Sequence, residues 1–331
     1  MDSITQIVLG AAVGEAVLGR KIGNKAMLLG ALGGTIPDFD VAATFFTDTV
    51  TALEIHRGFT HSIVFAISFG LLFGWLCSLW DKRATLKQWW LFWFSCFVTH
   101  ALLDTHTTWG TQLFWPLDIR LDYKNIFVID PLYTLPFLTF LLIAAFHRKD
   151  NPKRRKFNNL GLIVSTSYLC LTIILKGFAF VKFKNELESQ EISHLGIQVK
   201  PSPFNTIMWI ANVETEDSFL IGYYSFFDTQ PVQFYEHPKN HEALGDLAED
   251  PLVKRLIKIT ESWYTISIKN NQVYLNDLRF GQLSVNPETE RYAFSYLIEE
   301  TDSGVHISEE IKDSRDARKL LSDLWERMWG N

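Results

Sequence analysis

Apolar residues crowd the first half of the chain and form stretches that contain no Lys, Arg, Asp or Glu. Four of these stretches approach membrane length: Phe59–Trp80, Gln88–Leu103, Pro131–Phe146 and Phe157–Leu175. A helix needs about 20 residues to cross a bilayer, so the second and third stretches must borrow from their flanks. The pattern predicts membrane-spanning helices in this half of the chain.

Two shorter apolar segments, Ile4–Leu18 and Ala26–Ile36, precede these stretches and are rich in small residues. Glycines recur at a spacing of four within them, at Gly10, Gly14, Gly30 and Gly34. Small residues at this spacing let helices pack closely in lipid. A buried core hairpin is the alternative for this pair. We expect about six helical membrane segments in all.

The pattern changes after Leu175, where charged and apolar residues begin to alternate. Strands are predicted at Ser218–Phe227, Trp263–Ile268 and Gln272–Leu278, the last two joined by a tight turn at Asn270-Asn271. Helical periodicity is found in Leu252–Ile259 and Ala317–Trp329. The predicted fold is therefore an all-α multi-pass membrane helical bundle over residues 1–181, followed by a small α+β soluble domain over residues 182–331.

Basic residues mark alternate connections between the expected segments, around residues 20–25, 82–87 and 148–156. The positive-inside rule places these loops in the cytoplasm. The other connections, residues 47–58 and 104–130, would then face outward together with the N-terminus. We expect a multi-pass protein of the cell (inner) membrane whose C-terminal domain lies on the extracytoplasmic side.

Composition excludes several classes of protein. The formal net charge of −6 gives no support for a nucleic-acid partner. The cysteines Cys77, Cys96 and Cys170 all lie in apolar runs, so they indicate neither a disulfide framework nor a thiolate metal site. The sequence contains no G-x-S-x-G elbow, P-loop or G-x-G-x-x-G motif, which leaves serine hydrolases and nucleotide-binding proteins without support.

Histidine and aspartate residues gather at the ends of the apolar segments, in IPDFD (Ile36–Asp40), HRGFTHS (His56–Ser62) and HALLDTHTTWG (His100–Gly110). Ionisable groups are costly at such positions, which makes each a candidate for function. The expected topology brings all three strings to one outward surface. Their side chains offer the nitrogen and oxygen ligands of a catalytic metal site. The predicted ligands are Asp38, Asp40, His56, His61, His100 and Asp104.

Taken singly, these residues are also consistent with purely structural roles. His100 and Asp104 are four apart and share a helical face, so they can bind one ion or bridge two, but a simple hydrogen bond between them fits equally well. His56 and His61 are five apart and come together only if the chain turns at Gly58. The IPDFD string alone is also consistent with an aspartate-rich turn.

Two further residues are predicted to act on a substrate. The guanidinium of Arg57 could clamp phosphate oxygens, the alternative being a structural ion pair or a lipid-headgroup contact. His106 could act as an acid–base group or a further ligand, and a solvated loop histidine is the alternative. Asp2, Gln6 and Asp130 could complete a coordination sphere or hold a ligand histidine in place.

The chain resembles the YdjM-type family of membrane-bound, metal-dependent hydrolases over roughly its first 150 residues. The matching strings are MDSITQIVLGAAVG (Met1–Gly14), GGTIPDFD (Gly33–Asp40), HRGFTHS, THALLDTHTTWGTQLFWPLD (Thr99–Asp118) and NIFVIDPLY (Asn125–Tyr133). The resemblance implies a helical membrane unit with a divalent metal, zinc, and a distant similarity to zinc-dependent phospholipase C and its nuclease relatives. Many relatives carry a histidine where this chain has Gln6, so the expected number of ions stays between one and three.

These observations predict a membrane-bound metal-dependent hydrolase that cleaves a phosphoester or related bond through a metal-activated water. Its partner is the lipid bilayer, and a lipid or lipid-linked substrate follows from location alone. Arg57 would neutralise charge on the transferred group. The alternative is a non-catalytic membrane metal-binding module, which would be a sensor, a structural partner or a transporter. A transporter needs ionisable residues along a path across the bilayer, whereas these candidates lie at one surface.

Overall fold

The computed structural model describes residues 1–285, 291–302, 304–311 and 317–331. By its internal contacts the chain divides into two units. The helical unit comprises residues 1–43, 55–174 and 203–205, and the sheet unit comprises residues 44–54, 175–202 and 206–331. The domain boundary expected between residues 181 and 182 stays a prediction.

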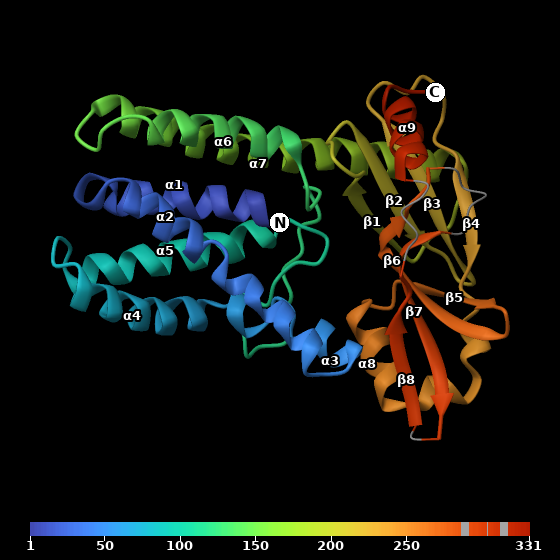
Figure 1. Cartoon of the computed structure of the whole chain (residues 1–331). Helices are drawn as coiled ribbons and strands as arrows, with labels where there is room; N and C mark the ends of the chain where they lie inside the picture. The colour runs from blue at the N-terminus through green and yellow to red at the C-terminus, as the bar shows by residue number, and fades with distance from the viewer. Residues whose placement is uncertain (286–290, 303, 312–316) are drawn as a thin grey trace. The chain divides into compact units, whose positions relative to one another are not determined.

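Helices that lie side by side build the helical unit (Figure 1). They are α1 (Ser3–Ile22), α2 (Asn24–Gly33), α4 (Ile63–Trp80), α5 (Leu86–Asp104), α6 (Pro131–Ala145) and the first part of α7 (Pro152–Ser189). Two 3-10 helices, η1 (Ile36–Phe45) and η2 (Phe59–His61), and the short helix α3 (Thr49–Ile55) lie between α2 and α4 in the chain.

The expected bundle of six membrane segments is wrong. Among the described residues, only α4 and α7 are long and apolar enough to cross a membrane by length and composition. Helix α6 has 15 residues and α2 has 10, while α1 carries Glu15 and α5 includes uncharged polar side chains. The prediction of six segments relied on the absence of charged residues. A stretch without charges can still contain polar side chains and be too short or too polar to cross a membrane. With two candidate spans, the loop-charge argument for a multi-pass protein of known orientation no longer holds.

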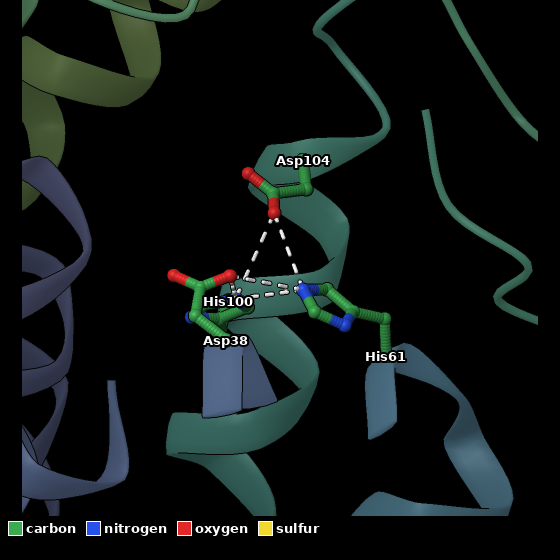
Figure 2. A group of neighbouring side chains, drawn as sticks. All are labelled: Asp38, His61, His100 and Asp104. Atoms are coloured by element: carbon green, nitrogen blue, oxygen red, sulfur yellow. Dashed lines mark hydrogen bonds and ion pairs between the residues drawn. The ribbon is translucent and has the colours of Figure 1, made fainter. Parts of the chain in front are cut away.

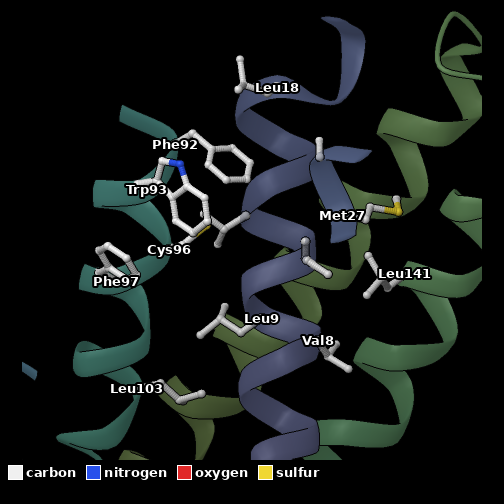
Figure 3. Packing of buried hydrophobic residues seen from close by; sticks show 14 of the residues in the cluster. Val8, Leu9, Leu18, Met27, Phe92, Trp93, Cys96, Phe97, Leu103 and Leu141 are labelled. Atoms are coloured by element: carbon white, nitrogen blue, oxygen red, sulfur yellow. The ribbon is translucent and has the colours of Figure 1, made fainter. Parts of the chain in front are cut away.

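Close packing of α1 against α2 is confirmed at the small residues. A Cβ atom added to Gly10 would lie 2.2 Å from the carbonyl oxygen of Gly30, and one added to Gly34 would lie 2.2 Å from that of Gln6. Helices α5 and α6 pack against the α1–α2 pair through buried apolar side chains, among them Leu9, Phe97 and Leu141 (Figure 3). The α1–α2 pair is therefore the centre of the helical unit.

A buried ion pair joins α7 to this centre. The guanidinium of Arg154 donates to both carboxylate oxygens of Glu15, at 2.6 and 2.5 Å, and also to Asn24. Both side chains of the pair are almost completely buried. Glu15 therefore has a packing role, because it links α1 to α7 inside the helical unit.

Two antiparallel four-stranded sheets form most of the sheet unit, with strand orders β1-β2-β3-β4 and β5-β6-β7-β8. The strands are β1 (Gly196–Pro201), β2 (Met208–Glu214), β3 (Ser218–Ser225), β4 (Phe234–Pro238), β5 (Tyr264–Lys269), β6 (Gln272–Gln282), β7 (Tyr292–Thr301) and β8 (Gly304–Glu309). The helices are η3 (His241–Glu249), α8 (Pro251–Ile259) and α9 (Ala317–Met328). The predicted strands, the two helices and the turn at Asn270-Asn271, both with positive φ, are confirmed.

The segment from Thr44 to Glu54, which contains most of α3, belongs to the sheet unit although it is remote in sequence. Val50 is 1% exposed and lies in one hydrophobic cluster with Val253 and Leu256 of α8. The guanidinium of Arg255 donates to both carboxylate oxygens of Glu54, at 3.0 and 2.5 Å. From the sequence, most of this segment is expected only as part of the outward connection 47–58.

Candidate metal centre

Four of the six predicted ligands meet at one point of the helical unit: Asp38, His61, His100 and Asp104 (Figure 2). Asp38 lies near the start of η1, which begins next to Pro37, and His61 ends η2. His100 and Asp104 lie in the last turns of α5. Ser62 follows His61 and caps α4 by accepting the backbone N–H of Phe65 at 3.0 Å, which fixes the direction in which the chain leaves the site.

The ligand atoms have the spacing of a small coordination shell. The Nε2 atoms of His61 and His100 are 3.0 Å apart, and each lies 3.4 Å from Oδ1 of Asp38. Oδ2 of Asp104 lies 3.4 Å from Nε2 of His61 and 3.7 Å from that of His100. All four atoms fall within 4.8 Å of one another. A tetrahedral ion with bonds of about 2.0–2.2 Å holds its ligand atoms roughly 3.3–3.6 Å apart. The separations of 3.0–3.7 Å are close to this range, so the donor set could hold a divalent ion such as zinc.

The other ring nitrogens are already engaged. Nδ1 of His100 lies 2.7 Å from the carbonyl oxygen of Gly34, which can only accept a hydrogen bond. Nδ1 of His61 lies 3.0 Å from the hydroxyl of Thr60. If each Nδ1 carries its proton, each neutral ring presents a lone pair at Nε2. Two lone pairs that face each other at 3.0 Å need a cation or a proton between them.

The surrounding charges favour a cation. Burial alone would lower the pKa of His61, but its hydrogen bonds to Asp104, Asp38 and Asp40 raise that pKa to about 9. Burial would raise the pKa of Asp38, but hydrogen bonds from His100 and His61 hold it well below its usual range. The side chains of His61, His100 and Asp104 are at most 1% exposed, and that of Asp38 is 24% exposed. Asp38 is therefore the one of the four cluster residues that solvent reaches.

Asp40 and His56, also predicted as ligands, are not brought into the four-residue cluster. Oδ2 of Asp40 lies 3.4 Å from Nδ1 of His61, the ring nitrogen opposite the cluster. The same oxygen accepts hydrogen bonds from the backbone N–H of Arg57 at 2.7 Å and the hydroxyl of Thr60 at 3.0 Å. His56 pairs through Nδ1 with Oδ1 of Asp40 at 3.0 Å. Asp40 thus supports His61 at the ring nitrogen that does not face the cluster. Asp38 and Asp40 point in different directions because they are two residues apart in a 3-10 helix.

Arg57 and His106, the predicted catalytic residues, differ in their distance from the cluster. Arg57 is buried, and its Nε lies 3.2 Å from Oδ2 of Asp104, while Nη1 donates to the hydroxyl of Thr107 at 2.7 Å. Its φ of 57° is unusual for a residue with a side chain and is held by the backbone bond to Asp40. His106 bonds to Asn125 through Nδ1 at 2.9 Å and is not part of the four-residue cluster.

The three candidate supporting residues take different places. Asp2 caps α1 by accepting the backbone N–H groups of Ile4 and Thr5, and Asp130 caps α6. Gln6 donates from Nε2 to Oδ1 of Asp104 at 2.9 Å. It therefore fixes the carboxylate of Asp104 through the oxygen that does not face the two histidines.

The amino group of Met1 also contacts Oδ1 of Asp104. Sequence reasoning missed this contact, the Gly34 carbonyl and Thr107. Of these three groups, only Gly34 could be linked to the site from the sequence, because it lies in the GGTIPDFD motif that contains Asp38.

Comparison with known proteins identifies a family whose model covers the helical part of the chain. Residues 1–179 match the family model described as YdjM inner membrane protein. The uncharacterized protein YfhP of Bacillus subtilis is 26% identical over 238 residues, which cover 67% of this chain and 68% of YfhP. The inner membrane protein YbcI of Escherichia coli is 33% identical over 112 residues, which cover 34% of this chain and 64% of YbcI. No solved structure matches the chain. Because the family model covers more than half of its length, the chain belongs to the YdjM inner membrane protein family.

Proposed function

We propose that this membrane-associated protein is a metal-dependent hydrolase that cleaves a phosphoester or a related bond at the cluster of Asp38, His61, His100 and Asp104. The observation that carries the proposal is the pair of Nε2 atoms 3.0 Å apart, each with its opposite nitrogen engaged, beside two carboxylates. A bound zinc ion would supply Lewis-acid chemistry there, including activation of water near neutral pH.

The cluster consists of three buried ligands and one ligand that solvent can reach. His61, His100 and Asp104 are buried, and each is fixed by a second contact: Thr60 for His61, the Gly34 carbonyl for His100 and Gln6 for Asp104. Asp38 is the exposed member, so a substrate would arrive on its side. Such fixed donors lower the cost of reorganisation during a reaction.

The positive charge of Arg57 is the second feature of the proposed active site. Its Nε contact with Asp104 at 3.2 Å keeps the guanidinium beside the donor atoms. Charge that develops on a transferred phosphoryl group would be partly neutralised there. The lipid bilayer is the partner that family membership implies, and a lipid or lipid-linked substrate is part of the proposal.

A non-catalytic metal site is the second candidate, and one observation favours it. Four protein ligands close a tetrahedral zinc site, whereas catalytic zinc sites keep one position open. If Asp38 remained bound at all times, the ion would serve as a structural link between η1, η2 and α5. The partial exposure of Asp38 favours the catalytic candidate, because this ligand is the one that solvent can displace.

Metal content and hydrolysis test the proposal together. Purified full-length protein should contain stoichiometric zinc or a similar ion and should hydrolyse bis(4-nitrophenyl) phosphate, with loss of activity in a chelator and recovery with zinc. The double variant His100→Ala with Asp104→Ala should lose both metal and activity. His194→Ala with Asp150→Ala removes the same side-chain types away from the cluster and should keep both.

The outcomes separate the candidates. Full metal content in the His100→Ala, Asp104→Ala variant contradicts the metal centre itself. Loss of metal from that variant, combined with no turnover by the zinc-loaded wild-type protein, supports the non-catalytic site and contradicts the hydrolase. Thermal unfolding of both variants, followed by circular dichroism, shows whether a loss of metal reflects a loss of fold.

A further inference from the structure

A cleft of about 480 Å³ lies in the helical unit away from the metal centre. Its walls come from the end of α1, the start of α2, the end of α4 and the start of α5. Helix α5 contributes Trp89 to this cleft and Asp104 to the metal centre. At about 1.5 Å of rise per residue, the two sites are roughly 22 Å apart along that helix.

Apolar side chains line most of the cleft, and two of them are poorly covered by the protein. Leu28 of α2 is 70% exposed, and Trp80, the last residue of α4, is 94% exposed. Helix α4 is one of the two helices long and apolar enough to cross a membrane. Tryptophan is enriched at the membrane–water interface, so Trp80 would place the mouth of the cleft at the depth of lipid headgroups. The exposed apolar surface is therefore positioned to be covered by lipid.

The charge around the mouth of the cleft is strongly positive. The two connections that border it, residues 19–25 and 81–88, contain Arg20, Lys21, Lys25, Lys82, Arg83 and Lys87 against a single acidic residue, Asp81. Hydrogen bonds from Arg83 lower the pKa of Asp81 to about 2, and the nearby charge of Lys25 acts in the same direction. Asp81 is thus ionised and paired with Arg83 at 2.5 Å, and it offsets only part of this positive charge.

Lys25 is the basic residue that lines the cleft itself. It is exposed, lies one turn of α2 before Leu28 and faces the same cleft as Trp80. A cationic group next to an apolar cleft matches a ligand with an anionic head and an apolar tail. Basic residues beside a membrane-spanning helix attract anionic lipid headgroups in this way. The volume falls within the range of about 300–1,000 Å³ that is usual for small-molecule sites.

We infer that this cleft binds an anionic phospholipid, with one acyl chain against Leu28 and Trp80 and the phosphate beside Lys25. The inference does not depend on the proposed hydrolase, because no residue of the metal centre takes part in it. A zwitterionic lipid would fill the apolar cleft but would gain less from the surplus of positive charge. A second copy of the chain would bring the same positive charges together and is disfavoured by repulsion.

Lipid binding to the full-length chain tests the inference. The detergent-solubilised protein is titrated with dioleoylphosphatidylglycerol or dioleoylphosphatidylcholine, and bound lipids are counted by native mass spectrometry. The anionic lipid should bind more tightly. Lys25→Gln should weaken its binding about fivefold, the effect expected for one lysine near an anionic headgroup. Lys25→Arg should restore it. Lys156→Gln, which removes the same charge from an exposed site on α7, should bind as wild type.

Three results would overturn the inference. The first is equal affinity of the wild-type protein for the two lipids. The second is equal weakening by Lys25→Gln and Lys156→Gln, which would indicate a general charge effect. The third is a change in the proportion of dimer in Lys25→Gln with unchanged lipid binding, which would make a second copy the occupant. Because Lys25 is exposed, the variants are expected to fold.

Discussion

At the residue scale, the difference between Asp38 and Asp40 explains how the metal centre is built. Asp38 faces both Nε2 atoms, whereas Asp40 contacts Nδ1 of His61. A carboxylate behind a ligand histidine fixes the ring orientation and increases its basicity as a ligand. Asp40 also accepts bonds from Arg57 and Thr60, so one buried carboxylate organises the whole turn before His61.

Replacing Asp40 by Asn should therefore reduce metal affinity by roughly 10–100-fold without abolishing binding, because all four ligands remain. Competition titration with a chromogenic chelator would measure the change, and the nitrogen chemical shifts of His61 would show altered hydrogen bonding at Nδ1. Asp150→Asn, at an exposed loop position, is the control. Equal affinity of the two variants would contradict the supporting role of Asp40.

Four of the six ligands predicted from the sequence meet in the cluster, but the sequence could not assign the roles of the six. His100 and Asp104 share a helical face at a spacing of four, and the structure brings them together. The sequence predicts both Asp38 and Asp40 as ligands of one metal site. They lie in a 3-10 helix, where residues two apart point in different directions. Only the local backbone conformation decides between these arrangements.

At the element scale, the α1–α2 pair links helix packing to the metal centre. The carbonyl oxygen of Gly34, which accepts the hydrogen bond from His100, follows the end of α2. The same glycine approaches Gln6 of α1, whose side chain bonds to Asp104. The distance between the two helices therefore sets the position of two groups that hold ligands.

The variant Gly30→Ala should separate α1 from α2, because its Cβ would lie 2.2 Å from the carbonyl oxygen of Gly10. Overpacking of this kind costs roughly 1–3 kcal/mol, and metal affinity should fall with it. Gly177→Ala places the same methyl group on α7 where nothing lies within 4 Å, so it should be neutral or slightly stabilising. Thermal unfolding and metal titration of both variants would check this. Similar results for the two would contradict the packing argument.

The close approach of these two helices was visible in the sequence, because glycines at a spacing of four have few other uses in an apolar helix. The number of membrane spans was not visible in the sequence. Helix α5 is free of charge over Gln88–Leu103 but contains Ser95, Thr99 and His100, and many of its side chains are buried within the helical unit. Charge-free length identifies a buried helix as readily as a spanning one.

At the scale of the whole molecule, the packing units do not follow the order of the chain. Val50 and Leu53 of α3 belong to the hydrophobic cluster of α8 and the second sheet, about two hundred residues later in sequence. No periodicity in the sequence could show this association, because it depends on contacts between distant segments rather than on local pattern.

Val50→Ala should lower the free energy of unfolding of the sheet unit by roughly 1–3 kcal/mol, since a side chain that is 1% exposed leaves a cavity. Hydrogen–deuterium exchange would show faster exchange of the amides of α8. Val64→Ala, at a position 43% exposed on α4, is the matched control and should leave α8 unchanged. Unchanged exchange of α8 in Val50→Ala would show that α3 is not part of this core.

The placement of α3 has a practical consequence for dividing the protein. The segment that matches the family model, residues 1–179, contains α3 but not the α8 side chains that cover Val50 and Leu53. If the chain were cut after α7, these two apolar side chains would face solvent, and Glu54 would lose Arg255. A stable shortened protein would need polar replacements at positions 50 and 53, so the limits of the family match are not the limits of an independently folding piece.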